Sequence, residues 1–180
     1  MGVAKLLEEL EAGASSGRYV PICGPVKGKL LGMLASIARP KKILELGTAI
    51  GYSTIILAHT APQAKVLTID IGNEWTEEAK ANFKKSGLDN IEFRQADAIK
   101  ETKKLKGPYD FIFLDIAKEQ YAAVLEDCIR LLPANGLLVA DNASWKELKE
   151  YNRLCLADKR LRHLLVPIED GMALSLKVSD

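Results

Sequence analysis

The sequence has few of the features that mark secreted, membrane or nucleic-acid-binding proteins. Its 180 residues include only three cysteines, Cys23, Cys128 and Cys155. An odd number spaced so far apart predicts no disulfide framework and indicates a reducing compartment. No stretch approaches the apolar length needed to cross a bilayer. The formal net charge is +1 and no long basic run is present, so nucleic acid is not indicated as a partner. We expect a cytoplasmic protein.

Histidine is also scarce, and no repeats or low-complexity tracts interrupt the chain. The two histidines, His59 and His163, are isolated, so no cluster of histidine and cysteine suggests a zinc site. The hydrophobic content of 48% is ample for one buried core. We expect an N-terminal helical extension over residues 1–40, which would be a lid or a packing arm, followed by one domain over residues 41–180.

Apolar runs alternate with helical patterns from residue 42 onward, which predicts an α/β fold with a doubly wound, mostly parallel sheet. Seven strands are expected, at residues 42–46, 65–70, 91–95, 110–115, 137–140, 162–166 and 172–178. The last strand alternates apolar residues with smaller or polar ones, which is typical of an antiparallel strand buried on one face. We expect its buried face to hold Met172, Leu174, Leu176 and Val178.

The sequence predicts the buried face of one helix and the first residue of another. The first precedes the strand at 42–46, and its apolar residues at helical spacing are Val26, Leu30, Leu34 and Ile37. That spacing predicts that these four side chains form its buried face. The second helix should begin at Ser144, because Glu147 three residues later completes a capping-box pattern, and it should run to about Ala157.

The segment from Leu44 to Ser53 predicts a strand, a tight loop and a helix N-terminus, the place where open α/β sheets bind nucleotide-like ligands. A dinucleotide fingerprint in register with Gly47 would need glycines where this chain has Ala49 and Tyr52. Glu45 would repel a phosphate and attract an ammonium or a sulfonium. S-adenosylmethionine fits this pattern, and an ordinary strand-loop-helix crossover is the alternative.

Carboxylates follow the ends of several predicted strands. Asp70 ends the second strand, about 20 residues beyond the glycine loop, where an ionised carboxylate can accept hydrogen bonds from both ribose hydroxyls. A turn or a helix cap is the alternative role. Asp97 follows the third strand, and we expect Asp97 and Ala98 to flank the adenine.

Asp115, Asp141 and Asn142 follow the fourth and fifth strands, which should be neighbours. Two carboxylates and one amide oxygen form an incomplete shell of hard ligands, which suits Mg²⁺ with positions left for water or substrate. An ordinary Asp-Asn turn is the alternative. Lys118, three residues after Asp115, could take a proton from a substrate hydroxyl, or it could be a solvated lysine at the start of the next helix.

These segments together resemble the class I S-adenosylmethionine-dependent O-methyltransferases, specifically the metal-dependent catechol and caffeoyl-CoA type. The resemblance extends over nearly the whole chain from residue 24. The matching segments are Gly24-Pro25-Val26-Lys27-Gly28, residues 44–53, residues 67–70, residues 113–121, Asp141-Asn142 with Trp145, and Pro167-Ile168-Glu169-Asp170-Gly171. The Asp-x-x-Lys element together with Asp-Asn is the most specific part.

The resemblance implies a seven-stranded methyltransferase fold and a role for each matching residue. Glu45, Gly47 and Ser53 would hold the methionine end of S-adenosylmethionine. The other cofactor-binding positions implied are Cys23, Thr48, Asp70, Ile71, Asp97, Ala98 and Asp115. Asp115, Asp141 and Asn142 would bind Mg²⁺ or another divalent cation, and Lys118 would be the catalytic base. The acceptor would be a small catechol-like molecule with two neighbouring hydroxyls.

Two departures from the family pattern affect the part of the chain that shapes the acceptor pocket. The loop after Asn142 is short and the N-terminal region is brief, so a second copy of the chain could complete the pocket as a homodimer. Three other functions are alternatives to an O-methyltransferase. The nearest is a methyltransferase of the same fold that acts on nitrogen or carbon. Another is a non-catalytic cofactor-binding or interaction protein, in which Lys118 and both aspartates would be dispensable. A dehydrogenase is disfavoured by the glycine spacing.

Overall fold

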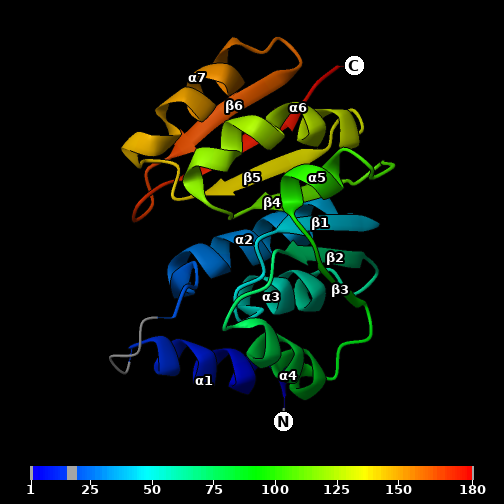
Figure 1. Ribbon diagram of the computed structural model, residues 1–180, viewed down its shortest axis with the longest axis vertical. Coiled ribbons are helices and arrows are strands. Elements are labelled where there is room, and N and C mark those ends of the chain that lie inside the picture. The colour runs from blue at the N-terminus through cyan, green and yellow to red at the C-terminus, as the bar shows by residue number, and fades with distance from the viewer. Residues whose placement is uncertain (1, 16–19, 180) are drawn as a thin grey trace.

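A seven-stranded sheet forms the centre of the molecule in a computed structural model that describes residues 2–15 and 20–179 (Figure 1). The strand order is β3-β2-β1-β4-β5-β7-β6. The first five strands pair in parallel, and β7 runs antiparallel to both β5 and β6. The strand bounds are β1 Lys42–Leu46, β2 Lys65–Asp70, β3 Ile91–Gln95, β4 Phe111–Leu114, β5 Leu137–Asp141, β6 Leu161–Val166 and β7 Met172–Lys177. The predicted fold class is confirmed.

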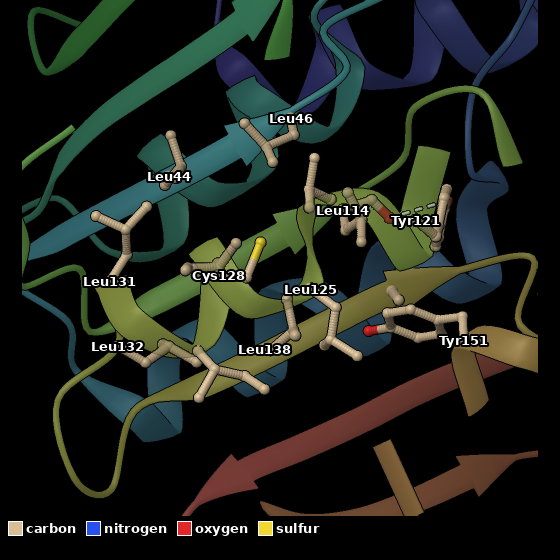
Figure 2. Close-up of a cluster of buried hydrophobic side chains, with 14 of the residues drawn as sticks. Leu44, Leu46, Leu114, Tyr121, Leu125, Cys128, Leu131, Leu132, Leu138 and Tyr151 are labelled. Carbon is tan, nitrogen blue, oxygen red and sulfur yellow. Dashed lines mark hydrogen bonds between the residues drawn. The ribbon is translucent and has the colours of Figure 1, made fainter. Parts of the chain in front are cut away.

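Helices cover both faces of this sheet because successive residues of a strand point to opposite sides. The helix bounds are α1 Val3–Ser15, α2 Gly24–Ala38, α3 Tyr52–Thr60, α4 Thr76–Ser86, α5 Ala98–Thr102, α6 Tyr121–Leu131 and α7 Lys149–Ala157, with short 3₁₀ helices η1 Lys118–Gln120 and η2 Lys146–Leu148. In β1, Ile43 packs in the core with α2 and α3, while Leu44 and Leu46 pack in the core with α6 and α7. Figure 2 shows the core between the sheet and α6. The central strands are therefore buried on both sides.

Helix α1 packs against α3 and α4 at the end of the molecule near β3 (Figure 1). Leu6 is fully buried there, and the Tyr52 hydroxyl donates a hydrogen bond of 2.6 Å to Glu11 Oε1. Residues 16–19 of the expected N-terminal extension lie outside the described residues. Within residues 2–15 and 20–179, every helix is too short or too polar to cross a membrane.

The buried face of α2 differs from the predicted one. Val26 and Ile37 are 49% and 76% exposed, whereas Lys27, Leu31 and Ala35 are buried. Leu30 and Leu34 are half-buried and pack against the core, so the prediction was wrong for Val26 and Ile37, because it followed apolar residues alone. The helix instead places its small residues against α3, where a side chain at Gly28 would lie within 3 Å of Tyr52 and Ile56.

The predicted buried face of β7 was wrong in part. Met172 is fully buried and Leu174 packs against the core, but the other face is buried as well. Ala173, Ser175 and Lys177 are buried, while Leu176 and Val178 are more than a third exposed. The Lys177 ammonium donates to the carbonyl oxygen of Leu132 at 2.8 Å, at the end of α6. The side that α6 and α7 cover is therefore buried at all three residues, although it holds the less apolar ones, whereas the opposite side is fully buried only at Met172.

The helix predicted from the capping box at Ser144 begins five residues later. Residues 146–148 form a 3₁₀ turn, and α7 starts at Lys149. The backbone N–H of Ser144 donates to the carbonyl oxygen of Asp170 at 2.9 Å. Because Ser144 is held against the loop before β7, it does not cap the helix.

Candidate functional site

Two adjoining cavities lie at the carboxyl ends of β1, β2 and β4, with volumes of about 280 and 190 Å³. They share the walls formed by Pro21, Gly47, Ala49, Asp115 and Ile116. Nine of the ten predicted cofactor-binding residues line one or both cavities: Cys23, Gly47, Thr48, Ser53, Asp70, Ile71, Asp97, Ala98 and Asp115. The tenth, Glu45, lies below the loop in the sheet. The fold thus brings together residues from five separate segments.

The glycine loop gives one cavity wall its shape. Gly47 has φ of 98°, in the left-handed region that favours glycine, and its N–H donates to the Ile69 carbonyl oxygen at 2.8 Å. A Cβ at Gly47 would lie 2.0 Å from the Asp115 carbonyl oxygen. Only glycine therefore lets the loop approach the end of β4 this closely.

Glu45 is fully buried near the carboxyl end of β1, two residues before Gly47. Thr54 donates a hydrogen bond to its Oε2 atom, while Oε1 has no hydrogen-bond partner among the described residues. Burial raises the pKa of Glu45 to about 7, although the hydroxyls of Ser53, Thr54 and Thr68 oppose the rise. A cationic donor near Oε1 would satisfy this carboxylate.

Asp70 supports the loop and lines the larger cavity. Its Oδ2 accepts from the N–H groups of Thr48 at 2.9 Å and Ala49 at 3.3 Å, and its Oδ1 accepts from Gly72 N–H at 2.9 Å. Asp97 caps α5 by accepting from Lys100 N–H at 3.2 Å and lines the same cavity. Asp70 therefore has the turn role that was its alternative, and Asp97 caps a helix, which was not predicted. Both positions also allow contact with a ligand in the cavity.

The three predicted metal ligands lie at the carboxyl ends of two neighbouring strands, with Asp141 as the last residue of β5. Leu114 of β4 pairs with Ala140 of β5, so Asp115 and Asp141 are side by side at the sheet edge. Burial first, and then the negative charge of Asp115, raise the pKa of Asp141 to about 6, against the lowering effect of Lys27. Asn142 has φ of 53°, an uncommon conformation that turns the chain directly after β5.

Lys118 lies beside this carboxylate pair. Its ammonium is 2.6 Å from Asp115 Oδ1 and donates to the Tyr121 hydroxyl at 3.0 Å. The Tyr121 hydroxyl is also within hydrogen-bonding distance of the carbonyl oxygens of Leu114 and Asp141, at 3.1 and 3.3 Å (Figure 2 shows Tyr121 beside Leu114). The Lys118 ammonium is 5.8 Å from the centre of the Trp145 ring. Lys118 is therefore held at the site and is not a freely solvated lysine.

The donor set fits a hard divalent cation, with an amide in place of a third carboxylate. Within the described part of the chain, no three His, Cys, Asp or Glu side chains form a metal-binding group. Asn142 Nδ2 donates to Asp170 Oδ2 at 2.5 Å, which leaves the amide oxygen for a metal. The lysine bonds go to Oδ1 of Asp115 and Oδ1 of Asp141, which leaves Oδ2 of each carboxylate as a ligand. Mg²⁺ prefers such oxygen ligands.

Two charged residues at the site were not predicted as functional. Lys27 comes from α2 and Asp170 from the loop before β7, and their side chains are 2.6 Å apart. Both lie in segments that carry the family resemblance, but the helical pattern of α2 placed Lys27 on the wrong face. A lysine at helical spacing with Leu31 and Ala35 was the available signal.

Comparison with known proteins supports one family. A sequence profile described as O-methyltransferase matches residues 4–178. The chain is 34% identical to a catechol O-methyltransferase of Niastella koreensis, over 76% of this chain and 65% of the relative. It is 30% identical to caffeoyl-CoA O-methyltransferase 2 of Petunia hybrida, over 85% of this chain and 75% of the relative. The structure of a Bacillus cereus O-methyltransferase in complex with SAH, 23% identical, superposes with a TM-score of 0.85 over 97% of this chain and 90% of that chain.

The sheet order and the cavities at the ends of β1, β2 and β4 define the class of protein, an α/β methyltransferase fold with an antiparallel β7. The profile match over almost the full length makes the identification more specific. The chain belongs to the O-methyltransferase family, a family of S-adenosylmethionine-dependent enzymes.

Proposed function

We propose that this enzyme transfers a methyl group from S-adenosylmethionine to one hydroxyl of a small catechol-like acceptor, with help from Mg²⁺. The observation that carries the proposal is the position of Asp115. It lines the nucleoside-sized cavities and also stands beside Asp141, the next strand's carboxylate. A cofactor in the cavities and a cation on the carboxylates would therefore be neighbours. The names of the catechol and caffeoyl-CoA relatives agree with such an acceptor.

The proposed cofactor contacts follow from the polar groups around the cavities. Asp70 would bind the ribose hydroxyls, and Ile71, which is 68% exposed at the cavity, would cover the adenine with Ala98. Ser53 and the Gly47 loop would hold the methionine end above Glu45, whose unpartnered Oε1 can accept from an ammonium. Cys23 would pack over this end.

S-adenosylmethionine would supply the methyl group and leave as S-adenosylhomocysteine (SAH). Asp115, Asp141 and Asn142 would hold Mg²⁺, whose charge would favour the ionised form of an acceptor that chelates it through two hydroxyls. Lys118 would accept the proton from the reacting hydroxyl. Tyr121 holds the Lys118 ammonium from one side and Asp115 from the other, so the amine is already positioned at the cation site. Trp145, 43% exposed, provides an aromatic wall near Lys118.

The test combines a panel of acceptors with control of the metal. The purified protein is incubated with isotopically labelled S-adenosylmethionine and either a catechol, a phenol with one hydroxyl, or an aromatic amine, with Mg²⁺ or with EDTA. We expect labelled product from the catechol only, and only with Mg²⁺. Equal activity in EDTA would contradict the metal step, and preference for the amine would favour the N-methyltransferase alternative.

A further inference from the structure

A buried lysine joins the N-terminal part of the chain to the predicted metal ligands. Lys27, near the start of α2, is only 3% exposed. Its ammonium is 2.5 Å from Asp141 Oδ1 and 2.6 Å from Asp170 Oδ1. Burying an ammonium is costly unless it is paired, and here it has two carboxylate partners.

Asn142 closes these contacts into a ring. Its backbone N–H donates to Asp141 Oδ1 at 2.8 Å, and its side-chain Nδ2 donates to Asp170 Oδ2 at 2.5 Å. The ring therefore runs from Lys27 to Asp141, Asn142, Asp170 and back to Lys27. Backbone bonds fix the two loops to each other, because Ala143 N–H donates to the Gly171 carbonyl oxygen at 3.0 Å.

The ring determines which ligand atoms remain for a cation. An ionised carboxylate only accepts hydrogen bonds, so Asp170 binds the Nδ2 atom of the Asn142 amide. The amide oxygen of Asn142, Oδ1, is therefore left on the other side. Lys27 and the Asn142 N–H both bind Oδ1 of Asp141, which leaves Oδ2. Neither Lys27 nor Asp170 lines the two cofactor cavities.

We propose that Lys27 and Asp170 are positioning residues that orient Asp141 and Asn142 for a divalent cation, an inference that rests on the metal site of the proposed function. Residues that orient metal ligands in this way commonly increase metal affinity by about 10–100-fold. Lys27 acts on Asp141 and Asp170 acts on Asn142. Loss of either residue should therefore weaken cation binding and leave the cofactor cavities intact.

The experiment uses Mn²⁺ as the divalent cation and SAH, the demethylated form of the cofactor, and measures the binding of each separately, without turnover. Free Mn²⁺ is followed by electron paramagnetic resonance, and SAH by calorimetry, for the wild type, Lys27→Met and Asp170→Ala. Methionine keeps the length of the lysine side chain without its charge. Lys29→Met is the matched control, because Lys29 is exposed on the same helix two residues away. We expect the Mn²⁺ Kd to rise about 10–100-fold in both ring variants, with SAH Kd within about twofold of wild type and Lys29→Met unchanged.

Each outcome decides between the two proposals. Wild-type protein that binds no Mn²⁺ would overturn the proposed metal site and this inference with it. Wild-type binding with unchanged Mn²⁺ affinity in both ring variants would overturn only the inference. Parallel loss of Mn²⁺ and SAH binding would show a merely structural role and would also overturn it. If Lys27→Met does not fold, Asp170→Ala decides, because it leaves Lys27 paired with Asp141.

Discussion

Single residues at the sheet edge serve both the fold and the site. Asp70 holds the glycine loop through Thr48 and Ala49 and also faces the larger cavity. Tyr121 contacts the ends of β4 and β5 through its hydroxyl and also accepts from Lys118. Variants at such residues change stability and binding together. Lys118 and Glu45 allow cleaner tests.

Lys118→Met tests the proposed base. The change removes the amine and keeps most of the aliphatic chain, so we expect kcat for a catechol to fall by about 10²–10⁴-fold. The Kd for SAH should change little. Lys149→Met, on the exposed start of α7, is the control. Steady-state kinetics and calorimetry give the two numbers, and retention of full kcat in Lys118→Met would exclude a proton-transfer role.

Glu45→Gln tests the buried carboxyl through the pH dependence of stability. The folded protein holds the pKa of Glu45 at about 7, above its ordinary value of 4.5. The folded state therefore retains a proton that the unfolded chain loses, and the free energy of unfolding should fall as pH rises between these values. The loss is on the order of 3 kcal/mol. Glutamine cannot ionise, so this part of the pH dependence should disappear.

Urea denaturation of the ligand-free protein at about pH 5 and pH 8 measures the effect, with m-values compared to exclude changes in the unfolded state. Glu9→Gln, on the exposed side of α1, should follow the wild-type curve. Identical pH dependence in wild type and Glu45→Gln would show that Glu45 does not retain its proton near neutral pH.

At the scale of elements, packing partners decide which face of a helix or strand is buried. Helix α2 buries Lys27, Leu31 and Ala35 and exposes Ile37, because it lies close to α3 and its lysine finds carboxylates at the ends of other elements. In β7, Ala173 packs in the core with α6 and α7. Patterns of apolar residues predicted the existence of these elements but not their orientation.

Gly47→Ala tests the loop between β1 and α3. The new Cβ would lie 2.0 Å from the Asp115 carbonyl oxygen at a residue with φ of 98°, so the loop or the end of β4 must move. We expect a loss of stability of about 1–3 kcal/mol or more and a weaker Kd for SAH. Gly13→Ala in α1 is the control, since its Cβ would contact none of the described residues, and stability should stay equal or rise by up to about 1 kcal/mol. Wild-type SAH affinity in Gly47→Ala would place the ligand away from this loop.

At the scale of the whole molecule, the strand order determines where ligands bind. The chain builds the sheet outward from β1 in one direction to β3 and then crosses to β4, so the order reverses between β1 and β4. Ligands of open α/β sheets bind at such a reversal, outside the carboxyl ends of the strands. The two cavities and the carboxylate pair lie at this place.

Ligand-induced stabilisation tests the whole site. SAH at 100 times its Kd should raise the free energy of unfolding by about 2.7 kcal/mol, which corresponds to roughly 5–10 °C in Tm for a chain of this size. NAD should give no shift, because Ala49 and Tyr52 replace the glycines of a dinucleotide loop. Differential scanning calorimetry with each ligand makes the comparison. A larger shift with NAD than with SAH would favour the dehydrogenase alternative.

The amino-acid sequence by itself determined the strands, their mostly parallel arrangement, the glycine loop and the aspartates at the strand ends. These features depend on local periodicity and on the rule that parallel strands end at one edge, so they are readable from neighbouring residues. Gly47, Asp70, Asp115 and Asp141 were identified in this way.

Only the tertiary structure decided which faces of α2 and β7 are buried, that Ser144 packs on the loop before β7, and that Lys27 and Asp170 join the site. Lys27 contacts Asp141 and Asp170 across 114 and 143 residues of chain. No local pattern encodes such a contact. It exists because α2, β5 and the loop before β7 converge at one edge of the sheet, where a buried charge must find its partners.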